Sequence, residues 1–184
     1  ETEESPLAPK PNNYHVSKAM GELLCQMYGT RGSLRTVILR ISAPYGYAGI
    51  NTAVIPKFIE WAKCDNDLEL WGKGTRSQVF TFVEDIGYAC ELAVEQYASY
   101  GVYHIAGNES ISMRELANKV LEAFPSSESR IVFSGAKDPK DGQAREISIA
   151  KAKRELGFEP QFKLSDGLNK IAENSERAFW HLTS

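Results

Sequence analysis

The chain has 184 residues, of which 42% are hydrophobic and 24% charged, and a formal net charge of −3. This length suits one domain with a core and is too short for two of ordinary size, and there is no basic excess to neutralise nucleic-acid phosphates. No apolar run approaches the roughly 20 residues that cross a bilayer and no leader segment is apparent, so we expect a soluble, cytoplasmic protein that binds neither nucleic acid nor membrane.

The first elements predict a helix followed by a strand. Apolar residues recur every three or four positions from Tyr14 to Tyr28, which is typical of an amphipathic helix, and Gly29 and Gly32 should end it. The stretch RTVILRIS, residues 35–42, is rich in β-branched and apolar residues and predicts a buried strand of a parallel sheet. A helix leading into such a strand indicates an α/β fold.

The middle of the chain continues this alternation. After a loop over 43–51, residues 53–64 predict a helix that buries one apolar face, formed by Ile55, Phe58, Ile59 and Ala62. Residues 68–83 predict a short strand, a glycine turn and a second strand. Asp85 is then expected to act as the N-cap of a helix over 86–97.

The remaining segments keep the same order of strands and helices. A strand is expected over 101–107, and Ser112 with Glu115 forms a capping box ahead of a helix over 116–124. Predictions for the rest of the chain are a strand over 130–135, a polar loop over 136–147, a short helix stopped by Gly157, and a last helix over 165–182 that buries Leu168, Ile171, Ala172 and Phe179.

Cysteine and histidine offer no support for a disulfide framework or a metal site. Cys25, Cys64 and Cys90 are odd in number and widely spaced within helical patterns, so buried thiols are expected. The three histidines are equally scattered, and the sequence therefore predicts no metal.

Tyr14 and Lys18 form the first candidate site. Residues four apart lie on one face of a helix, and a fixed cation near a phenol favours the phenolate, which is the tuning that a general acid/base needs. The alternative is that the two are ordinary residues of a helix surface.

Five ordered stretches give the pair a wider context. They are P-x-x-x-x-Y-x-x-S-K from Pro9 to Lys18 with Glu22 beyond it, LRISAPYG, LELWGKGTRSQVFTFVEDIGYA, VYHIAGNESISMRELA, and AKAKRELGFEPQFKLSDGL. Over nearly its whole length, the chain resembles the extended short-chain dehydrogenase/reductase family, specifically its nucleotide-sugar epimerases, dehydratases and reductases.

The resemblance implies an α/β fold built on a partial Rossmann-type parallel sheet with a small mixed α/β substrate-binding region. Residues 1–46 and 80–106 would belong to the dinucleotide-binding domain, and 47–79 and 107–184 to the nucleotide-sugar region. The family's glycine-rich phosphate loop is absent, as are the residue that selects NAD or NADP and the Ser/Thr of the catalytic triad. We therefore expect the chain to be the C-terminal portion of a longer enzyme and to be inactive alone.

The resemblance also implies roles around the cofactor. Tyr14 would be the acid/base at a sugar hydroxyl or ketone, and Lys18 would bind the nicotinamide ribose of NAD or NADP. Ser42, Ala43 and Pro44 would lie along the nicotinamide, although Ala43 stands where many members have an asparagine near the substrate.

The resemblance implies a second group of residues at the substrate. Trp71 would lie beside the nucleotide base, with core packing as its alternative. Gln78 would lie near the diphosphate, where many members have an arginine. Lys140 and Arg145 would bind the diphosphate, and Arg145 suits this role because a guanidinium binds phosphate bidentately; a solvated surface arginine is its alternative.

Two wider hypotheses follow. The family often dimerises through the Tyr/Lys helix, so Met20, Leu24 and Met27 are candidate interface residues of a homodimer, or else they pack within the chain. A rival function is a non-catalytic module, a truncated or degenerate relative that binds a nucleotide-sugar or a partner without redox chemistry.

Overall fold

The computed structural model describes residues 2–5, 11–32, 34–47, 53–96 and 100–175. Although the length suits one ordinary domain, the chain divides into two compact units, which are described separately. The first comprises Glu1–Ser42, Ile86–Ala106 and Ile147–Glu159, and the second Ala43–Asp85, Gly107–Glu146 and Pro160–Ser184. The bounds of the units differ from the predicted ones at two places: residues 147–159 pack with the first unit, and residues 43–46 and 80–85 pack with the second. Which unit binds cofactor and which binds substrate stays a prediction.

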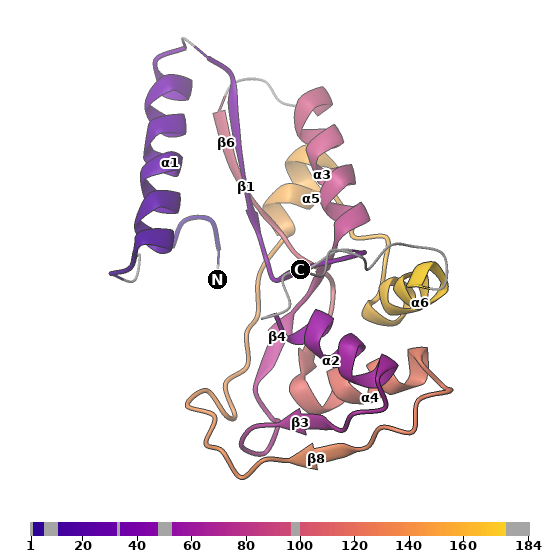
Figure 1. Cartoon of the computed structure of the whole chain (residues 1–184). Coiled ribbons are helices and arrows are strands. Elements are labelled where there is room, and N and C mark those ends of the chain that lie inside the picture. Colours follow the sequence, from indigo (N-terminus) through magenta and orange to yellow (C-terminus); the bar gives the residue numbers. More distant parts are fainter. Residues whose placement is uncertain (1, 6–10, 33, 48–52, 97–99, 176–184) are drawn as a thin grey trace, which may run out of the picture. The chain divides into compact units, whose positions relative to one another are not determined.

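A pair of parallel strands forms the centre of the first unit. β1 (Thr36–Ile41) lies beside β6 (Tyr100–Ile105), in register from Thr36↔Tyr100 to Ile41↔Ile105. The helix α1 (Asn13–Thr30) lies on one side of the pair, and α3 (Val83–Gln96) and α5 (Ala150–Leu156) lie on the other (Figure 1). The parallel pairing of strands joined through helices confirms the predicted α/β class.

The alternation of side chains along β1 explains why both faces of the pair are occupied. Val37 and Leu39 pack against the core formed by α3, β6 and α5, whereas Thr36 and Arg40 point the other way and hydrogen-bond to α1. The burial of β1 is nevertheless incomplete: Thr36–Arg40 are half-buried and Ile41 is exposed. The prediction of a fully buried strand was wrong in this respect, because β6 and α1 are its main neighbours among the described elements.

Three short strand pairs and three helices make up the described residues of the second unit. The parallel pairs are β2 (Pro44–Tyr45) with β5 (Thr81–Phe82) and β3 (Leu68–Leu70) with β8 (Ile131–Phe133); β4 (Ser77–Val79) is antiparallel to β7 (Ser110–Ser112). The helices are α2 (Val54–Lys63), α4 (Met113–Ala123) and α6 (Leu164–Ser175).

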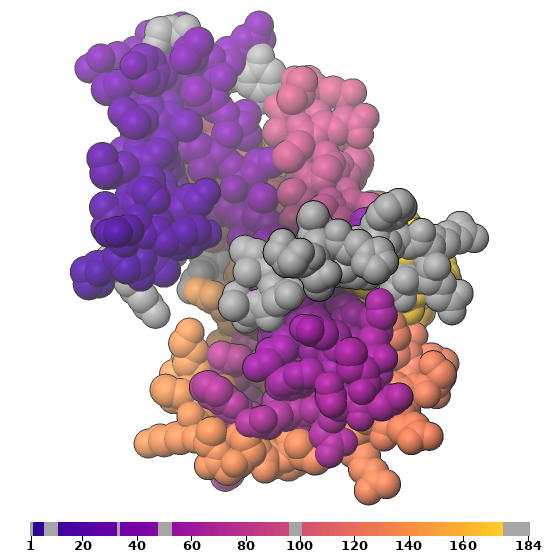
Figure 2. Space-filling view, viewed as in Figure 1, coloured from indigo at the N-terminus to yellow at the C-terminus, as the bar shows by residue number. Residues whose placement is uncertain are grey.

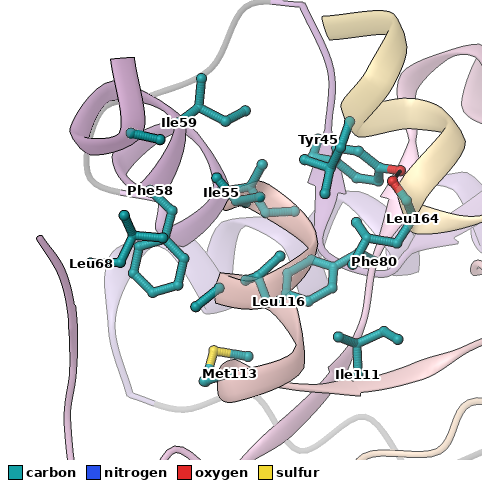
Figure 3. Close-up of a cluster of buried hydrophobic side chains, with 14 of the residues drawn as sticks. Tyr45, Ile55, Phe58, Ile59, Leu68, Phe80, Ile111, Met113, Leu116 and Leu164 are labelled. Atoms are coloured by element: carbon teal, nitrogen blue, oxygen red, sulfur yellow. Dashed lines mark hydrogen bonds between the residues drawn. The ribbon is translucent and has the colours of Figure 1, made fainter. Parts of the chain in front are cut away.

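The core of the second unit lies between these helices and the strands. Figure 3 shows Ile55 and Phe58 of α2 pointing toward Leu116 of α4, with Phe80 beside them. The buried face predicted for α2 is confirmed in full, and so is the capping box of Ser112 and Glu115 at the start of α4. In α6, Leu168 and Ile171 are buried as predicted, Ala172 is half-buried, and Phe179 lies outside the described residues.

The predictions about Asp85 and about the three cysteines were wrong. Asp85 does not act as an N-cap, because α3 begins at Val83 and places Asp85 inside the first turn; there its carboxylate is buried and accepts a hydrogen bond from the backbone N–H of Gln161 at 2.7 Å. The cysteines are not buried thiols: Cys64 and Cys90 are exposed and Cys25 is half-buried. Cys64 follows the last turn of α2, where the amphipathic pattern no longer determines burial.

Candidate functional site

The predicted acid/base pair lies in the first turns of α1. The Asn12 side chain begins this helix by accepting a hydrogen bond from the backbone N–H of His15 at 2.9 Å. Tyr14 is 67% exposed, and the Lys18 ammonium lies 5.8 Å from the centre of its ring, within the range of a cation–π contact. Figure 2 shows α1, in indigo, at the molecular surface. The structure therefore brings the two side chains together at a solvent-accessible position.

An ion pair joins this helix to the strand beneath it. Arg40 of β1 donates from Nε to one carboxylate oxygen of Glu22 at 3.1 Å and from its terminal nitrogen to the other, a bidentate geometry. Both side chains are largely buried, at 14% exposure for Glu22 and 22% for Arg40. Glu22 follows Lys18 by four residues and Tyr14 by eight, so the pair fixes the rotation of the helix that carries them.

The same strand pair also holds the start of the described chain. The backbone carbonyl of Glu3 accepts a hydrogen bond from Arg40 at 3.2 Å, and its carboxylate accepts one from the backbone N–H of His104 at 2.8 Å. Sequence reasoning noted Glu22 only as part of a motif and missed its partner. An arginine within an otherwise apolar strand was the available signal, since a charge in such a place needs a counter-charge.

The residues predicted along the nicotinamide follow the carboxyl end of β1. Ser42 is buried, and its backbone N–H donates to the carbonyl of Ile105 at 2.9 Å. Ala43 has a φ of +30°, which is strained for a residue with a Cβ, and its carbonyl accepts from the backbone N–H of Thr81 at 3.2 Å. Strained residues cluster at functional sites, and Pro44 then opens β2.

Trp71 and Gln78 lie on either side of a glycine turn in the second unit. Trp71 directly follows β3 and is 58% exposed, so the alternative that it packs in the core is wrong. Gln78 is half-buried in β4, where it pairs with Ile111 of β7. Trp71 is thus available to a ligand, which is the property a stacking residue requires.

Lys140 and Arg145 are exposed in a loop that runs beside this turn. The backbone N–H of Gly72 donates to the carbonyl of Ala136 at 2.8 Å, and that of Ser77 donates to the carbonyl of Gln143 at 2.9 Å. The carbonyl of Arg145 in turn accepts a hydrogen bond from the Ser110 hydroxyl at 3.0 Å. The structure therefore places the backbone segments of all four predicted substrate residues next to one another, while their contacts with a ligand stay predictions.

A polar cluster connects Tyr47, two residues after β2, with Glu84 of α3 and Lys170 of α6. The Tyr47 hydroxyl donates to the Glu84 carboxylate, which also binds the Lys170 ammonium at 2.7 Å. The hydrogen bond to Glu84 raises the pKa of Tyr47 to about 12, and the hydrogen bonds from Lys170 and Tyr47 lower the pKa of Glu84. Both shifts favour a neutral phenol beside a charged carboxylate at physiological pH.

Neither a metal site nor a membrane-spanning helix occurs in the described ranges. No group of three or more His, Cys, Asp or Glu side chains is placed to hold a metal ion in this part of the chain. Within the same residues, no helix combines the length and the apolar character that crossing a bilayer requires.

Comparison with known proteins places these features in a family. The model of the NAD dependent epimerase/dehydratase family matches residues 1–106. The low-salt glycan biosynthesis protein Agl12 of Haloferax volcanii is 34% identical over 172 residues, which are 94% of this chain and 54% of that protein. A dTDP-glucose 4,6-dehydratase of Streptomyces griseus is 29% identical over 183 residues, 97% of this chain and 55% of that enzyme. The chain spans about half the length of these relatives.

Solved structures show the same relationship in three dimensions. UDP-glucuronic acid 4-epimerase from Bacillus cereus, in complex with UDP-glucuronic acid and NAD, has a TM-score of 0.79 at 25% identity, covering 96% of this chain and 57% of that one. The dTDP-glucose 4,6-dehydratase DesIV from Streptomyces venezuelae, with NAD and TYD bound, has a TM-score of 0.78 at 27% identity, covering 96% and 54%. These likenesses confirm the predicted fold class, a Rossmann-type α/β fold.

Proposed function

The chain belongs to the NAD dependent epimerase/dehydratase family, and from this premise we propose that the whole protein is an NAD(P)-dependent nucleotide-sugar epimerase, dehydratase or reductase. The relatives named above include a dehydratase that acts on dTDP-glucose, and the solved neighbours include an epimerase of UDP-glucuronic acid with NAD bound. The substrate class proposed for this protein is accordingly a sugar linked to a nucleoside diphosphate.

One observation supports the catalytic part of the proposal above all others. Tyr14 and Lys18 lie together on an exposed helix face, and the Glu22–Arg40 ion pair anchors the same helix to the parallel strands. The ion pair holds the helix in place, so an exposed phenol with a lysine beside it can reach a bound sugar from a fixed position.

The residues present fit a nicotinamide cofactor. Ligands of α/β sheets bind beyond the carboxyl ends of the parallel strands, which is where Ser42 follows β1. The Lys18 ammonium could donate hydrogen bonds to ribose hydroxyls, and Ser42, Ala43 and Pro44 would line the nicotinamide ring. When bound, NAD or NADP supplies the acceptor or donor of the hydride.

Tyr14 would perform the proton transfer that accompanies this hydride transfer. Oxidation of a sugar alcohol to a ketone removes a hydride from carbon and a proton from oxygen, and the Tyr14 phenolate would accept that proton from the hydroxyl oxygen. In the reverse direction its phenol would return the proton to the ketone oxygen. Lys18, whose ammonium lies 5.8 Å from the centre of the Tyr14 ring, would hold the cofactor ribose beside the reacting hydroxyl.

The second unit would bind the nucleotide. The exposed Trp71 would stack on the base, and the Lys140 and Arg145 side chains would bind the diphosphate, with Gln78 as a polar neighbour. Their backbone segments lie next to one another in the structure, which supports this division of roles.

The proposal includes a homodimer formed through α1. Met20 and Leu24 are 59% and 52% exposed within this chain, so packing inside the chain does not account for them, whereas Met27 is half-buried. A second copy of α1 would cover the exposed pair.

Replacement of the phenol tests the enzyme against the rival binding module. In the whole protein, Tyr14→Phe should lower turnover of a nucleotide-sugar such as dTDP-glucose or UDP-glucuronic acid at least about 100-fold, which is the usual contribution of a general acid/base, and should leave sugar-nucleotide binding intact. Tyr28→Phe, at another exposed tyrosine of α1, is the matched control and should retain turnover. A Tyr14→Phe protein with parental turnover would end the catalytic proposal.

A further inference from the structure

Asp141 connects two segments of the second unit that lie far apart in the sequence. One oxygen of its carboxylate accepts a hydrogen bond from the backbone N–H of Lys73 at 2.8 Å. The other accepts from the backbone N–H of Thr75 at 3.1 Å and from the Thr75 hydroxyl at 2.5 Å. The Asp141 carboxylate thus binds the turn that directly follows Trp71.

The turn is shaped around this carboxylate. Gly72 has a φ of +59°, and a Cβ at this position would lie 2.6 Å from a carboxylate oxygen of Asp141, so both the backbone angle and the contact require glycine. The Thr75 hydroxyl also accepts a hydrogen bond from the backbone N–H of Gly142 at 3.0 Å. The hydrogen bonds from the Thr75 side chain and the Lys73 backbone lower the pKa of Asp141, so the carboxylate is charged at neutral pH.

A second aspartate fixes the internal shape of the loop. Asp138 is buried and accepts a hydrogen bond from the backbone N–H of Lys140 at 2.9 Å, and its carboxylate lies 3.3 Å from Nε of Arg76. The loop that carries Lys140 and Arg145 is therefore tied to the turn both at its start and in its middle.

We propose that Asp141 is a positioning residue of the nucleotide site: by holding this loop against the turn, it places Lys140 and Arg145 where they bind the diphosphate of a ligand whose base contacts Trp71. This role rests on the proposed function. None of the side chains it positions is buried, so packing alone cannot fix them. The Asp141 carboxylate constrains the middle of the loop through hydrogen bonds to backbone groups on the other segment.

The test measures binding of UDP, GDP and dTDP, each alone, to the whole protein by calorimetry. Asp141→Asn should weaken binding of the preferred diphosphate about tenfold, because misplaced charged donors lose most of their contribution. Thr75→Val removes the hydroxyl that contacts both Asp141 and Gly142 and should weaken binding about threefold, and it keeps the test valid if Asp141→Asn fails to fold.

Two controls separate positioning from general loss of structure. Asp67→Asn is the matched variant, because the Asp67 carboxylate also accepts a hydrogen bond from the backbone N–H of a distant residue, Arg130, at 2.9 Å. This contact lies at the opposite end of β3 from Trp71, so the substitution should leave affinity unchanged. The Asp141→Asn substitution should also lose most of its effect in a chain that already carries Lys140→Ala and Arg145→Ala, whereas a purely structural loss would be the same in both backgrounds.

The possible failures are distinguishable. Parental affinity of both Asp141→Asn and Thr75→Val, or an equal loss with and without Lys140 and Arg145, would overturn the positioning role and leave the proposed function standing. Absence of binding of all three nucleoside diphosphates to the unsubstituted whole protein would overturn the proposed substrate class and this role with it.

Discussion

Glu22→Gln is expected to loosen the helix that carries Tyr14 and Lys18. Gly29, which has no side chain, is the one fully buried residue of α1. The apolar side chains of Val16, Met20, Leu23 and Leu24 are all at least 40% exposed. The hydrophobic effect therefore contributes little to the attachment of α1 within the described residues. The Glu22–Arg40 pair and a hydrogen bond from the Thr36 hydroxyl to the carbonyl of Cys25 at 3.0 Å connect the helix to β1.

The magnitude follows from the geometry of the pair. Glutamine keeps one acceptor oxygen but loses the charge and the second acceptor that the half-buried Arg40 guanidinium contacts. Hydrogen bonds to charged groups contribute about 1.5–3 kcal/mol, and both side chains retain some solvent, so the loss should be about 2 kcal/mol. This corresponds to a roughly 30-fold larger population of the open helix.

Hydrogen exchange measures that population directly. Backbone amides of α1 should exchange about 30-fold faster in the variant, because a helix with few buried contacts opens as a local unit, and amides of α4 in the second unit should not change. Glu91→Gln, at an exposed glutamate of α3, is the matched control. Unchanged exchange of α1 in Glu22→Gln would refute the reasoning that this ion pair, rather than apolar packing, holds the helix.

Two further predictions concern backbone strain and pH. Gly87→Ala, inside α3, should stabilise the first unit by about 0.5–1 kcal/mol, and Gly157→Ala, at a φ of +71°, should destabilise it by about 1 kcal/mol. An added Cβ meets nothing within 4 Å at either position, so the backbone angle alone distinguishes the two. Effects of the same sign on the free energy of unfolding in urea would contradict the strain argument. Because its pKa is lowered, Glu84 stabilises the fold above its unfolded-state pKa of about 4.3, and this contribution disappears as the pH falls through the lowered value. Glu84→Gln should therefore reduce stability more at pH 7 than at pH 3, and a difference from the parent that is equal at both pH values would argue against the linkage.

The elements with strong local signals were predicted well. The buried face of α2 follows from the spacing of its apolar residues, and the start of α4 follows from the Ser112 and Glu115 capping box. The end of α5 at Gly157 is equally local, since that glycine has the left-handed angle that stops a helix. Such signals lie within a few residues of one another, so no knowledge of the tertiary structure is needed.

Predictions that depended on distant partners were less successful. The N-cap assigned to Asp85 is locally plausible, but its carboxylate binds the backbone at Gln161, 76 residues away. The strand β7 was not predicted at all, because its three residues are defined by pairing with β4 rather than by their own composition. The proximity of Tyr14 and Lys18 could be predicted because a helix sets it, whereas the partner of Glu22 lies 18 residues away on a strand.

Exposure of the functional side chains explains why polar anchors recur near them. A residue that must reach a ligand cannot be buried, and Tyr14 and Trp71 are accordingly 67% and 58% exposed. Their positions can then be fixed only through the backbone that carries them. In each unit a carboxylate provides this connection across a long sequence separation: Glu22 binds the strand under α1, and Asp141 binds the turn after Trp71. If this reasoning holds, loss of either carboxylate should affect function more than its cost in overall stability suggests, because each carboxylate positions exposed residues that few buried contacts hold.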